Sequence, residues 1–175
     1  MRKQPWLMPI ASLKQGDNRL AFELDIEELG GQEHEVKENP LFEQLVGKVR
    51  VELGITRTGK KLLVEGRVKF RARLDCAMCC TEFERQYDEP LVSEFLSTDD
   101  EPLVPSRELD DEDIGRTQVK GNMLDLRPEV RDAIHLAIPM APACSPDCKG
   151  LCAQCGADLN KGPCGCDSAV CVPRR

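Results

Sequence analysis

Cysteine spacing constrains this chain more than any other feature of its sequence. Seven of its ten cysteines fall within the last 35 residues, and the other three stand together at Cys76, Cys79 and Cys80. Thiols this close along a chain are either joined as disulfides or bound to a metal ion. The redox environment of the protein therefore decides which chemistry the cysteines perform.

The N-terminal sequence bears on that environment. It reads MRKQPWLMPI, in which two cations precede a short apolar stretch that Pro5 and Pro9 interrupt. This stretch is too short for a secretory signal, and no run approaches the roughly 18 apolar residues of a membrane span. We therefore expect no export signal, no membrane contact and a cytoplasmic location. Thiols stay reduced there, which favours metal binding over disulfides.

Eight of the cysteines form four closely spaced pairs. A Cys-x₂-Cys turn directs two sulfurs toward one point, and Gly156 directly after Cys155 lets the backbone turn beneath a metal. Two such pairs complete one tetrahedral site with four thiolate ligands. The pattern predicts two structural zinc ions held by Cys76, Cys79, Cys144, Cys148, Cys152, Cys155, Cys164 and Cys166.

The four pairs can be combined in more than one way. One combination closes only an eight-residue loop and gives a tail site of Cys152, Cys155, Cys164 and Cys166. It leaves a clamp site that would join the tail to the rest of the protein through Cys76, Cys79, Cys144 and Cys148. Other combinations stay open from the sequence alone. Cys166 has the least favourable spacing, although Gly165 permits the bend that it needs, and Cys80 and Cys171 are left outside both sites.

Charge is segregated along the chain. The net charge of −7 argues against indiscriminate nucleic-acid binding, and aromatic residues at 4% argue against large base-stacking platforms. Between Lys48 and Arg73, however, nine basic residues face only two acidic ones. Between Asp88 and Asp113, eleven acidic residues face Arg107 alone. The charge is therefore segregated by segment.

The basic segment also alternates in polarity. Apolar residues recur at every second position over 49–55 and 68–74, and a turn signal at 57–60 separates the two runs. This pattern predicts a β-hairpin with one apolar face. The opposite face then carries a row of like charges, Arg67, Lys69, Arg71 and Arg73. Either a bound anion or the acidic segment should offset their repulsion, so this row is either a neutralised, solvated face or a track for nucleic-acid phosphates.

Simpler patterns complete the fold prediction. Residues 20–24 and 81–96 alternate like strands, and residues 97–115 form an acidic, proline-containing loop with little to bury. Residues 125–138 carry one apolar stripe typical of an amphipathic helix, with Asp125 as N-cap and Pro139 as its stop. We expect an α+β protein with a predominantly antiparallel β body over residues 1–140. A small cysteine-rich zinc-binding tail would occupy residues 141–175.

Catalytic patterns are nearly absent. The sequence contains neither a phosphate-binding glycine loop nor a nucleophile elbow, and its two histidines, His34 and His135, are predicted to be surface residues. Sites made only of cysteine are closed and structural, whereas a catalytic zinc keeps an open position. We therefore expect neither an enzyme nor a small-molecule substrate.

The tail resembles a known family. Its sequence from Cys144 through Cys152-Ala-Gln-Cys155-Gly-Ala-Asp-Leu-Asn160 to Cys166 is similar to the ending of many YceD-family proteins. These are also called large ribosomal RNA subunit accumulation proteins. The resemblance extends upstream, through the strand that leads into Cys76 and the helix that ends at Pro139, and covers roughly residues 64–166. Cys80 directly after Cys79 departs from the family pattern and leaves that ligand ambiguous.

The resemblance implies a non-enzymatic factor for the synthesis, processing or stability of large-subunit ribosomal RNA. Its partners would be ribosomal RNA or ribosome-assembly proteins. The residue pattern adds a candidate contact surface, the basic row, for ribosomal RNA or for an acidic partner that binds it. An alternative is a zinc-stabilised adaptor that docks a basic protein through the acidic loop. A third possibility, a thiol redox protein, would need an exposed Cys-x₂-Cys pair of low pKa at a helix N-terminus, which none of the pairs clearly offers.

Overall fold

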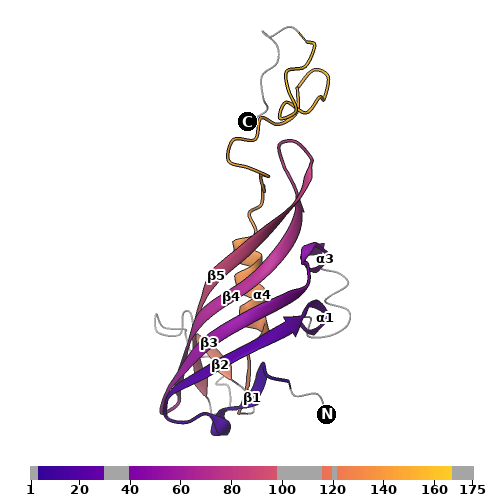
Figure 1. Cartoon of the computed structure of the whole chain (residues 1–175). Helices are drawn as coiled ribbons and strands as arrows, with labels where there is room; N and C mark the ends of the chain where they lie inside the picture. The colour runs from indigo at the N-terminus through magenta and orange to yellow at the C-terminus, as the bar shows by residue number, and fades with distance from the viewer. Residues whose placement is uncertain (1–3, 30–39, 98–115, 120–121, 167–175) are drawn as a thin grey trace, which may run out of the picture.

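A five-stranded sheet forms the centre of the computed structural model, which describes residues 4–29, 40–97, 116–119 and 122–166 (Figure 1). The strands, in spatial order, are β2 (Gly16–Asp25), β3 (Lys48–Thr58), β4 (Lys61–Asp75), β5 (Glu82–Ser97) and β6 (Arg116–Val119). Neighbours from β2 to β5 are antiparallel, whereas β6 runs parallel to β5. The predicted α+β fold with a mainly antiparallel body is confirmed.

The predicted basic hairpin is β3 and β4. Val51 lies opposite Val68, and Thr58 lies opposite Lys61, so a two-residue turn joins the strands. Gly59 occupies that turn with a φ of 62°, a conformation that glycine adopts without strain. The strand predicted at 20–24 lies within β2, and the strand predicted at 81–96 is β5, offset by one residue.

One face of the sheet carries the hydrophobic core. Helix α4 (Arg127–Ala137) packs against β4 and β5 and lies behind the sheet in Figure 1, while the short helices α1 (Ile26–Leu29) and α3 (Pro40–Gln44) lie near one end. Alternate strand residues point to this face and are fully buried, including Leu24, Val51, Ile55, Leu62, Val64 and Val68. Burying each such side chain contributes about 1.5–3 kcal/mol to folding, so the body is stabilised mainly by apolar packing.

Gly66 shows how closely β3 and β4 pack. It lies opposite Leu53 at a position where the alternation would place a core side chain. A Cβ atom there would sit 2.0 Å from the carbonyl oxygen of Glu52 and 2.7 Å from Leu53 Cδ2. No side chain fits at that distance, so only glycine allows the two strands to keep this geometry.

The start of α4 differs from the prediction. Asp125 ends strand β7 (Met123–Asp125), which pairs with β1 (Leu7–Pro9), and Leu126 is the N-cap. Asp125 still contributes, because its Oδ1 accepts the backbone N–H of Arg127 at 3.0 Å and its Oδ2 pairs with that guanidinium at 2.6 Å. The β1–β7 ladder extends the backbone through Asp125 and so delays the helix. The helix ends at Ala137, one residue before the predicted end, and Pro139 follows as the predicted stop.

Short elements escaped the sequence prediction. These are β1, the 3₁₀ turn η1 (Ile10–Ser12), α1, α3, β6 and β7, all of five residues or fewer. Each is too short for a periodic pattern of apolar and polar residues to be distinguished from the flanking sequence. The predicted acidic loop begins at Ser97, the last residue of β5, and its remainder lies outside the described residues.

The β4–β5 hairpin extends beyond the rest of the sheet. Its pairing continues to Asp75 opposite Glu82, whereas the β3–β4 ladder reaches only Lys69. Phe70 stacks on Tyr87 within this extension, with ring centroids 4.9 Å apart. The far end of the hairpin therefore projects toward the tail, and Figure 1 shows the two side by side.

Candidate metal centres and the charged face of the sheet

The clamp site forms where the β4–β5 hairpin meets the tail. The backbone folds into a tight turn between the strands, with Cys80 N–H donating to the carbonyl of Cys76 at 2.9 Å. This turn directs the sulfurs of Cys76 and Cys79 toward the tail, which supplies Cys144 and Cys148. All four Sγ atoms lie within 4.8 Å of one another, although about 70 residues separate the two pairs.

Distances in the clamp site suit a four-coordinate metal. Cys76 Sγ lies 3.7 Å from Cys148 Sγ, and Cys79 Sγ lies 3.7 Å from Cys144 Sγ. Four sulfurs at about 2.3 Å from a tetrahedral zinc are separated by about 3.8 Å. The hairpin sulfurs are also shielded, since Cys76 and Cys79 are 1% and 5% exposed. These residues fit a tetrahedral metal ion without rearrangement.

Backbone contacts hold the tail against the hairpin beside these sulfurs. Ala77 N–H donates to the carbonyl of Pro142 at 2.7 Å, and Leu151 N–H donates to the carbonyl of Met78 at 3.1 Å. Arg85 adds a side-chain contact, because its guanidinium donates to the carbonyl of Ala143 at 2.6 Å. The tail therefore meets the body at several points around the clamp site.

The tail site lies entirely within the C-terminal segment. Cys152, Cys155, Cys164 and Cys166 bring their Sγ atoms within 4.8 Å of one another. Gly156 has a φ of 73° and donates its N–H to the carbonyl of Cys152 at 2.9 Å, which closes the predicted turn. The sulfurs are therefore grouped in the combination that closes only the short loop between Cys155 and Cys164. Cys80 is exposed outside both groups, and Cys171 lies outside the described residues.

Thiol acidity differs among the sulfurs of each cluster. Burial raises the pKa of Cys76, but hydrogen bonds from backbone N–H groups, first that of Cys144, lower it to about 6. A hydrogen bond with Cys148, followed by burial, raises the pKa of Cys144 to about 12. A hydrogen bond with Cys155, again followed by burial, raises that of Cys166 to about 12. Ionising one sulfur opposes ionisation of its neighbours, so four thiolates require a bound positive charge.

The ligand sets contain only cysteine. In the part of the chain that the structure describes, neither candidate cluster includes a histidine or a carboxylate. His135 is exposed, as predicted, and its ring meets the edge of Phe42 with centroids 6.1 Å apart. His34 lies outside the described residues. Four thiolates fill a tetrahedral coordination sphere, so these clusters could hold metal ions in closed, structural sites.

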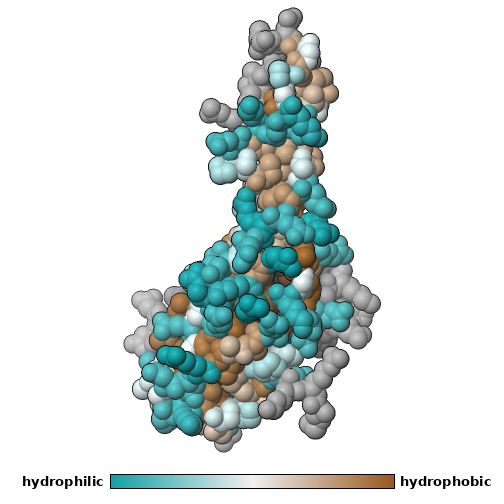
Figure 2. Space-filling model, viewed as in Figure 1, coloured by the Kyte–Doolittle hydropathy of each residue, from teal (hydrophilic) through white to brown (hydrophobic). Residues whose placement is uncertain are grey.

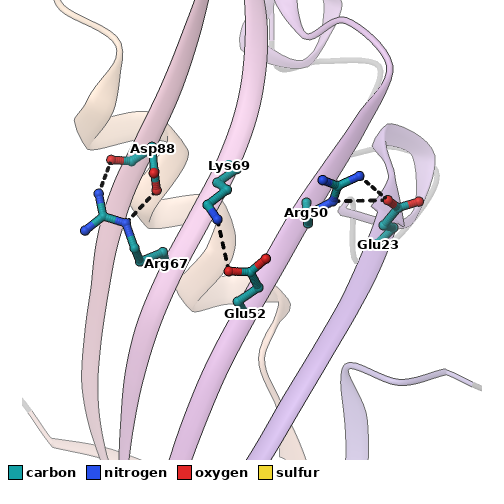
Figure 3. Close-up of polar contacts among 6 residues, drawn as sticks. All are labelled: Glu23, Arg50, Glu52, Arg67, Lys69 and Asp88. Carbon is teal, nitrogen blue, oxygen red and sulfur yellow. Dashed lines mark hydrogen bonds and ion pairs between the residues drawn. The ribbon is translucent and has the colours of Figure 1, made fainter.

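The basic row lies along the outer face of β4, opposite the core. Carboxylates on the neighbouring strands pair with three of its four cations. Arg67 Nε lies 2.6 Å from Asp88 Oδ1, and Lys69 Nζ lies 3.0 Å from Glu52 Oε2 (Figure 3). Arg73 Nη2 lies 2.9 Å from Glu84 Oε1, and this bond raises the arginine's pKa.

The negative charges that offset the basic row are not the ones expected from the sequence. Of these carboxylates only Asp88 belongs to the acidic segment. The others, Glu52 and Glu84, are cross-strand neighbours that lie outside that segment. Further pairs of the same kind, such as Arg50 with Glu23, extend across the face (Figure 3). Figure 2 shows that hydrophilic residues cover most of this side, with an apolar area over the lower sheet.

Arg71 differs from the other members of the row. It lies opposite Gln86 rather than a carboxylate, and its guanidinium reaches toward Gly47. Within the described residues, no ion pair joins Arg71 to a carboxylate. The row therefore has its least neutralised charge at Arg71.

Two residues beside the metal clusters were missed by sequence reasoning. Arg85 binds the tail and lies over the Phe83 ring at 5.2 Å, and nothing in the sequence distinguishes it from other strand arginines. Asn160 lies between the two clusters and bonds to Cys148 Sγ at 3.5 Å. Its spacing from Asp158 is typical of an Asx turn, which is the sequence signal that could have indicated it.

No helix in residues 4–29, 40–97, 116–119 or 122–166 has the length and apolar character needed to cross a membrane.

Comparison with known proteins identifies the family. Residues 64–174 match the family model described as large ribosomal RNA subunit accumulation protein YceD. An uncharacterized protein of Mycobacterium tuberculosis is 29% identical over 113 residues, which is 65% of this chain and 52% of that protein. The chloroplastic homologue 1 from Zea mays, named for large ribosomal RNA subunit accumulation, is 28% identical over 148 residues, covering 72% and 49%.

The homologue of the same name from Arabidopsis thaliana is 29% identical over 139 residues, covering 67% of this chain and 43% of that protein. The chain thus spans about half the length of the curated relatives that it matches. No solved structure gave a significant match. Because the family model covers most of the chain, including all eight clustered cysteines, the chain belongs to the YceD family.

Proposed function

We propose that this protein is a non-enzymatic factor that supports the synthesis, processing or stability of large-subunit ribosomal RNA. Membership of the YceD family carries this proposal, together with the names of the plant relatives. The all-cysteine clusters support a structural role for the metal, because a filled tetrahedron leaves no position for substrate. The cytoplasmic location stays a prediction, as does the division into a body of residues 1–140 and a tail of residues 141–175.

Zinc is the metal that we propose for both sites. Tetrahedral sets of four thiolates are typical of zinc or iron–sulfur centres, and zinc needs no redox partner to fold a small module. Metal analysis of protein purified under reducing conditions without chelator should give two equivalents of zinc per chain. A zinc content of one equivalent would contradict the second site. Finding iron and sulfide instead of zinc would show that both sites hold iron–sulfur centres.

The outer face of β4 is the proposed contact with ribosomal RNA. Its ion pairs are exposed, and such pairs contribute only about 0–1 kcal/mol each. A phosphate group can therefore replace a carboxylate partner at small cost. Among the described residues Arg71 has no carboxylate partner to displace, so it would make the first contact, with Arg67, Lys69 and Arg73 following along the strand.

Salt dependence tests this contact. Each phosphate neutralised by a cation releases counterions, so RNA affinity should fall steeply with salt concentration. The double variant Arg71→Ser and Arg73→Ser should reduce the log–log slope by roughly 1.5–2 without changing sequence preference. Arg19→Ser is the control, because it removes an exposed cation from β2, outside the row.

An unchanged slope in a folded double variant would exclude the row as a phosphate track. A ribosome-assembly protein would then be the partner to seek, by cross-linking in cells and identifying the captured species. The adaptor that uses the acidic loop would then become the leading candidate.

A further inference from the structure

Asn160 joins the two metal clusters. It is carried by the loop between Cys155 and Cys164, which belongs to the tail site, yet its side chain reaches the clamp site. Asn160 Nδ2 lies 3.5 Å from Cys148 Sγ, within the range of an N–H···S hydrogen bond. Its Oδ1 accepts the backbone N–H of Lys149, the residue after that ligand, at 2.9 Å. One carboxamide therefore contacts both a clamp-site sulfur and the backbone that positions it.

Neighbouring groups fix the orientation of this carboxamide. Oδ1 faces a backbone N–H and must accept, whereas Nδ2 faces Asp158 Oδ1 at 2.8 Å and must donate. Asp158 also accepts the backbone N–H of Asn160 at 3.0 Å, which completes an Asx turn. These bonds leave one Nδ2 hydrogen for the sulfur of Cys148.

The backbone reinforces the same connection. Leu159 N–H donates to the carbonyl of Gly150 at 3.0 Å, and Leu151 forms an isolated bridge with Asp158. The linker between Cys148 and Cys152 is thus held on one side by the tail-site loop. On its other side, Leu151 N–H bonds to Met78 in the hairpin turn. Order in the tail-site loop is therefore transmitted to the clamp site through a chain of direct contacts.

We propose that Asn160 is a positioning residue for the clamp site, through which metal binding at the tail site strengthens metal binding at the clamp site. The inference rests on the proposed pair of metal sites. A hydrogen bond to a metal-bound thiolate stabilises its negative charge and orients the sulfur. Groups that support metal ligands in this way typically change affinity by about 10–100-fold when removed.

The substitution Asn160→Asp replaces the donor with a negatively charged oxygen that faces Cys148 and Asp158. It preserves the size of the side chain and the oxygen that accepts from Lys149, but it removes the N–H groups that face Cys148 and Asp158. Zinc-loaded, full-length protein is challenged with a chelator and an alkylating reagent, and peptide mass spectrometry follows each cysteine separately. Cys76 and Cys148 should be alkylated about tenfold faster than in wild type. Cys155 and Cys164 should keep the wild-type rate.

Two further variants complete the test. Gln154→Ala changes an exposed polar residue of the same tail and should leave all rates unchanged. Cys164→Ser removes a tail-site ligand and should also accelerate alkylation of Cys148, because the loop that carries Asn160 loses its anchor. A wild-type rate at Cys148 in Asn160→Asp, or equal acceleration of both sites in that variant, would overturn the inference alone. If zinc protected none of the wild-type cysteines, the proposed metal sites would fail with it.

Discussion

The body and the tail are stabilised by different means. The body buries one continuous apolar cluster that runs from Trp6 to Ile134 along the inner face of the sheet and α4. The described part of the tail, residues 141–166, contributes no side chain to that cluster, and Cys152 is its one buried side chain. Its remaining order comes from turns and from contacts with the β4–β5 hairpin. A segment with so little to bury needs a cross-link or a metal to fold.

This difference predicts which region of the molecule each kind of change should destabilise. Loss of an apolar side chain should destabilise the body and leave metal binding unchanged. Loss of metal should release the tail and leave the sheet folded. The clamp site is the exception, because two of its ligands belong to each region.

Metal removal should have the largest effect. Binding of structural zinc contributes on the order of 10 kcal/mol to folding in small zinc modules, far more than the tail can gain by packing. A strong chelator should therefore abolish amide-exchange protection over residues 144–166, while β2 to β5 retain theirs. Hydrogen exchange followed by mass spectrometry measures both regions in one sample. Loss of protection in the sheet as well would show that the two regions fold as one unit.

Single ligand substitutions come next and separate the two sites. Cys155→Ser should remove one zinc and loosen the tail-site loop, with a smaller effect on the clamp site through Asn160. Cys79→Ser should remove the other zinc and detach the tail from the hairpin, because the Cys79 sulfur lies 3.7 Å from that of Cys144 in the tail. Proteolysis between Pro139 and Cys144 should accelerate mainly in Cys79→Ser. Equal cleavage of both variants would mean that the clamp does not act separately from the tail site.

Sequence reasoning succeeded where residue patterns have a fixed geometric meaning. Alternation of apolar and polar residues predicted β3 and β4, because successive side chains of a strand point to opposite faces of the sheet. Paired cysteines indicated two four-sulfur groups, because Cys-x₂-Cys directs both sulfurs to one point. Cross-strand partners could not be derived, since the pairing of Lys69 with Glu52 depends on register, which a single residue of slip would change. Asn160 was missed because its partner, Cys148, is near only after both loops fold.

Core truncation should have an intermediate effect confined to the body. Leu62 is fully buried, and Leu62→Ala should lower the free energy of unfolding by about 2–5 kcal/mol through lost burial and a cavity. The matched change Leu159→Ala affects a half-buried leucine of the tail and should leave the unfolding midpoint of the body unchanged. Urea denaturation followed by far-UV circular dichroism measures both, with zinc content as the control. A shift of similar size in Leu159→Ala would make the tail part of the cooperative core.

The smallest effect is expected on the outer face of the sheet. Lys69 and Glu52 are 33% and 50% exposed and meet at 3.0 Å, so water and salt screen their attraction. A double-mutant cycle with Lys69→Ala and Glu52→Ala should give a coupling energy below about 1 kcal/mol that declines further in high salt. Urea unfolding of the four proteins supplies the measurement. A weak coupling leaves Lys69 free to exchange its carboxylate for a phosphate, as the proposed RNA contact requires. A coupling above about 2 kcal/mol would instead mean that the ion pairs stabilise the sheet, and RNA would have to displace them at a cost that a few phosphate contacts cannot offset.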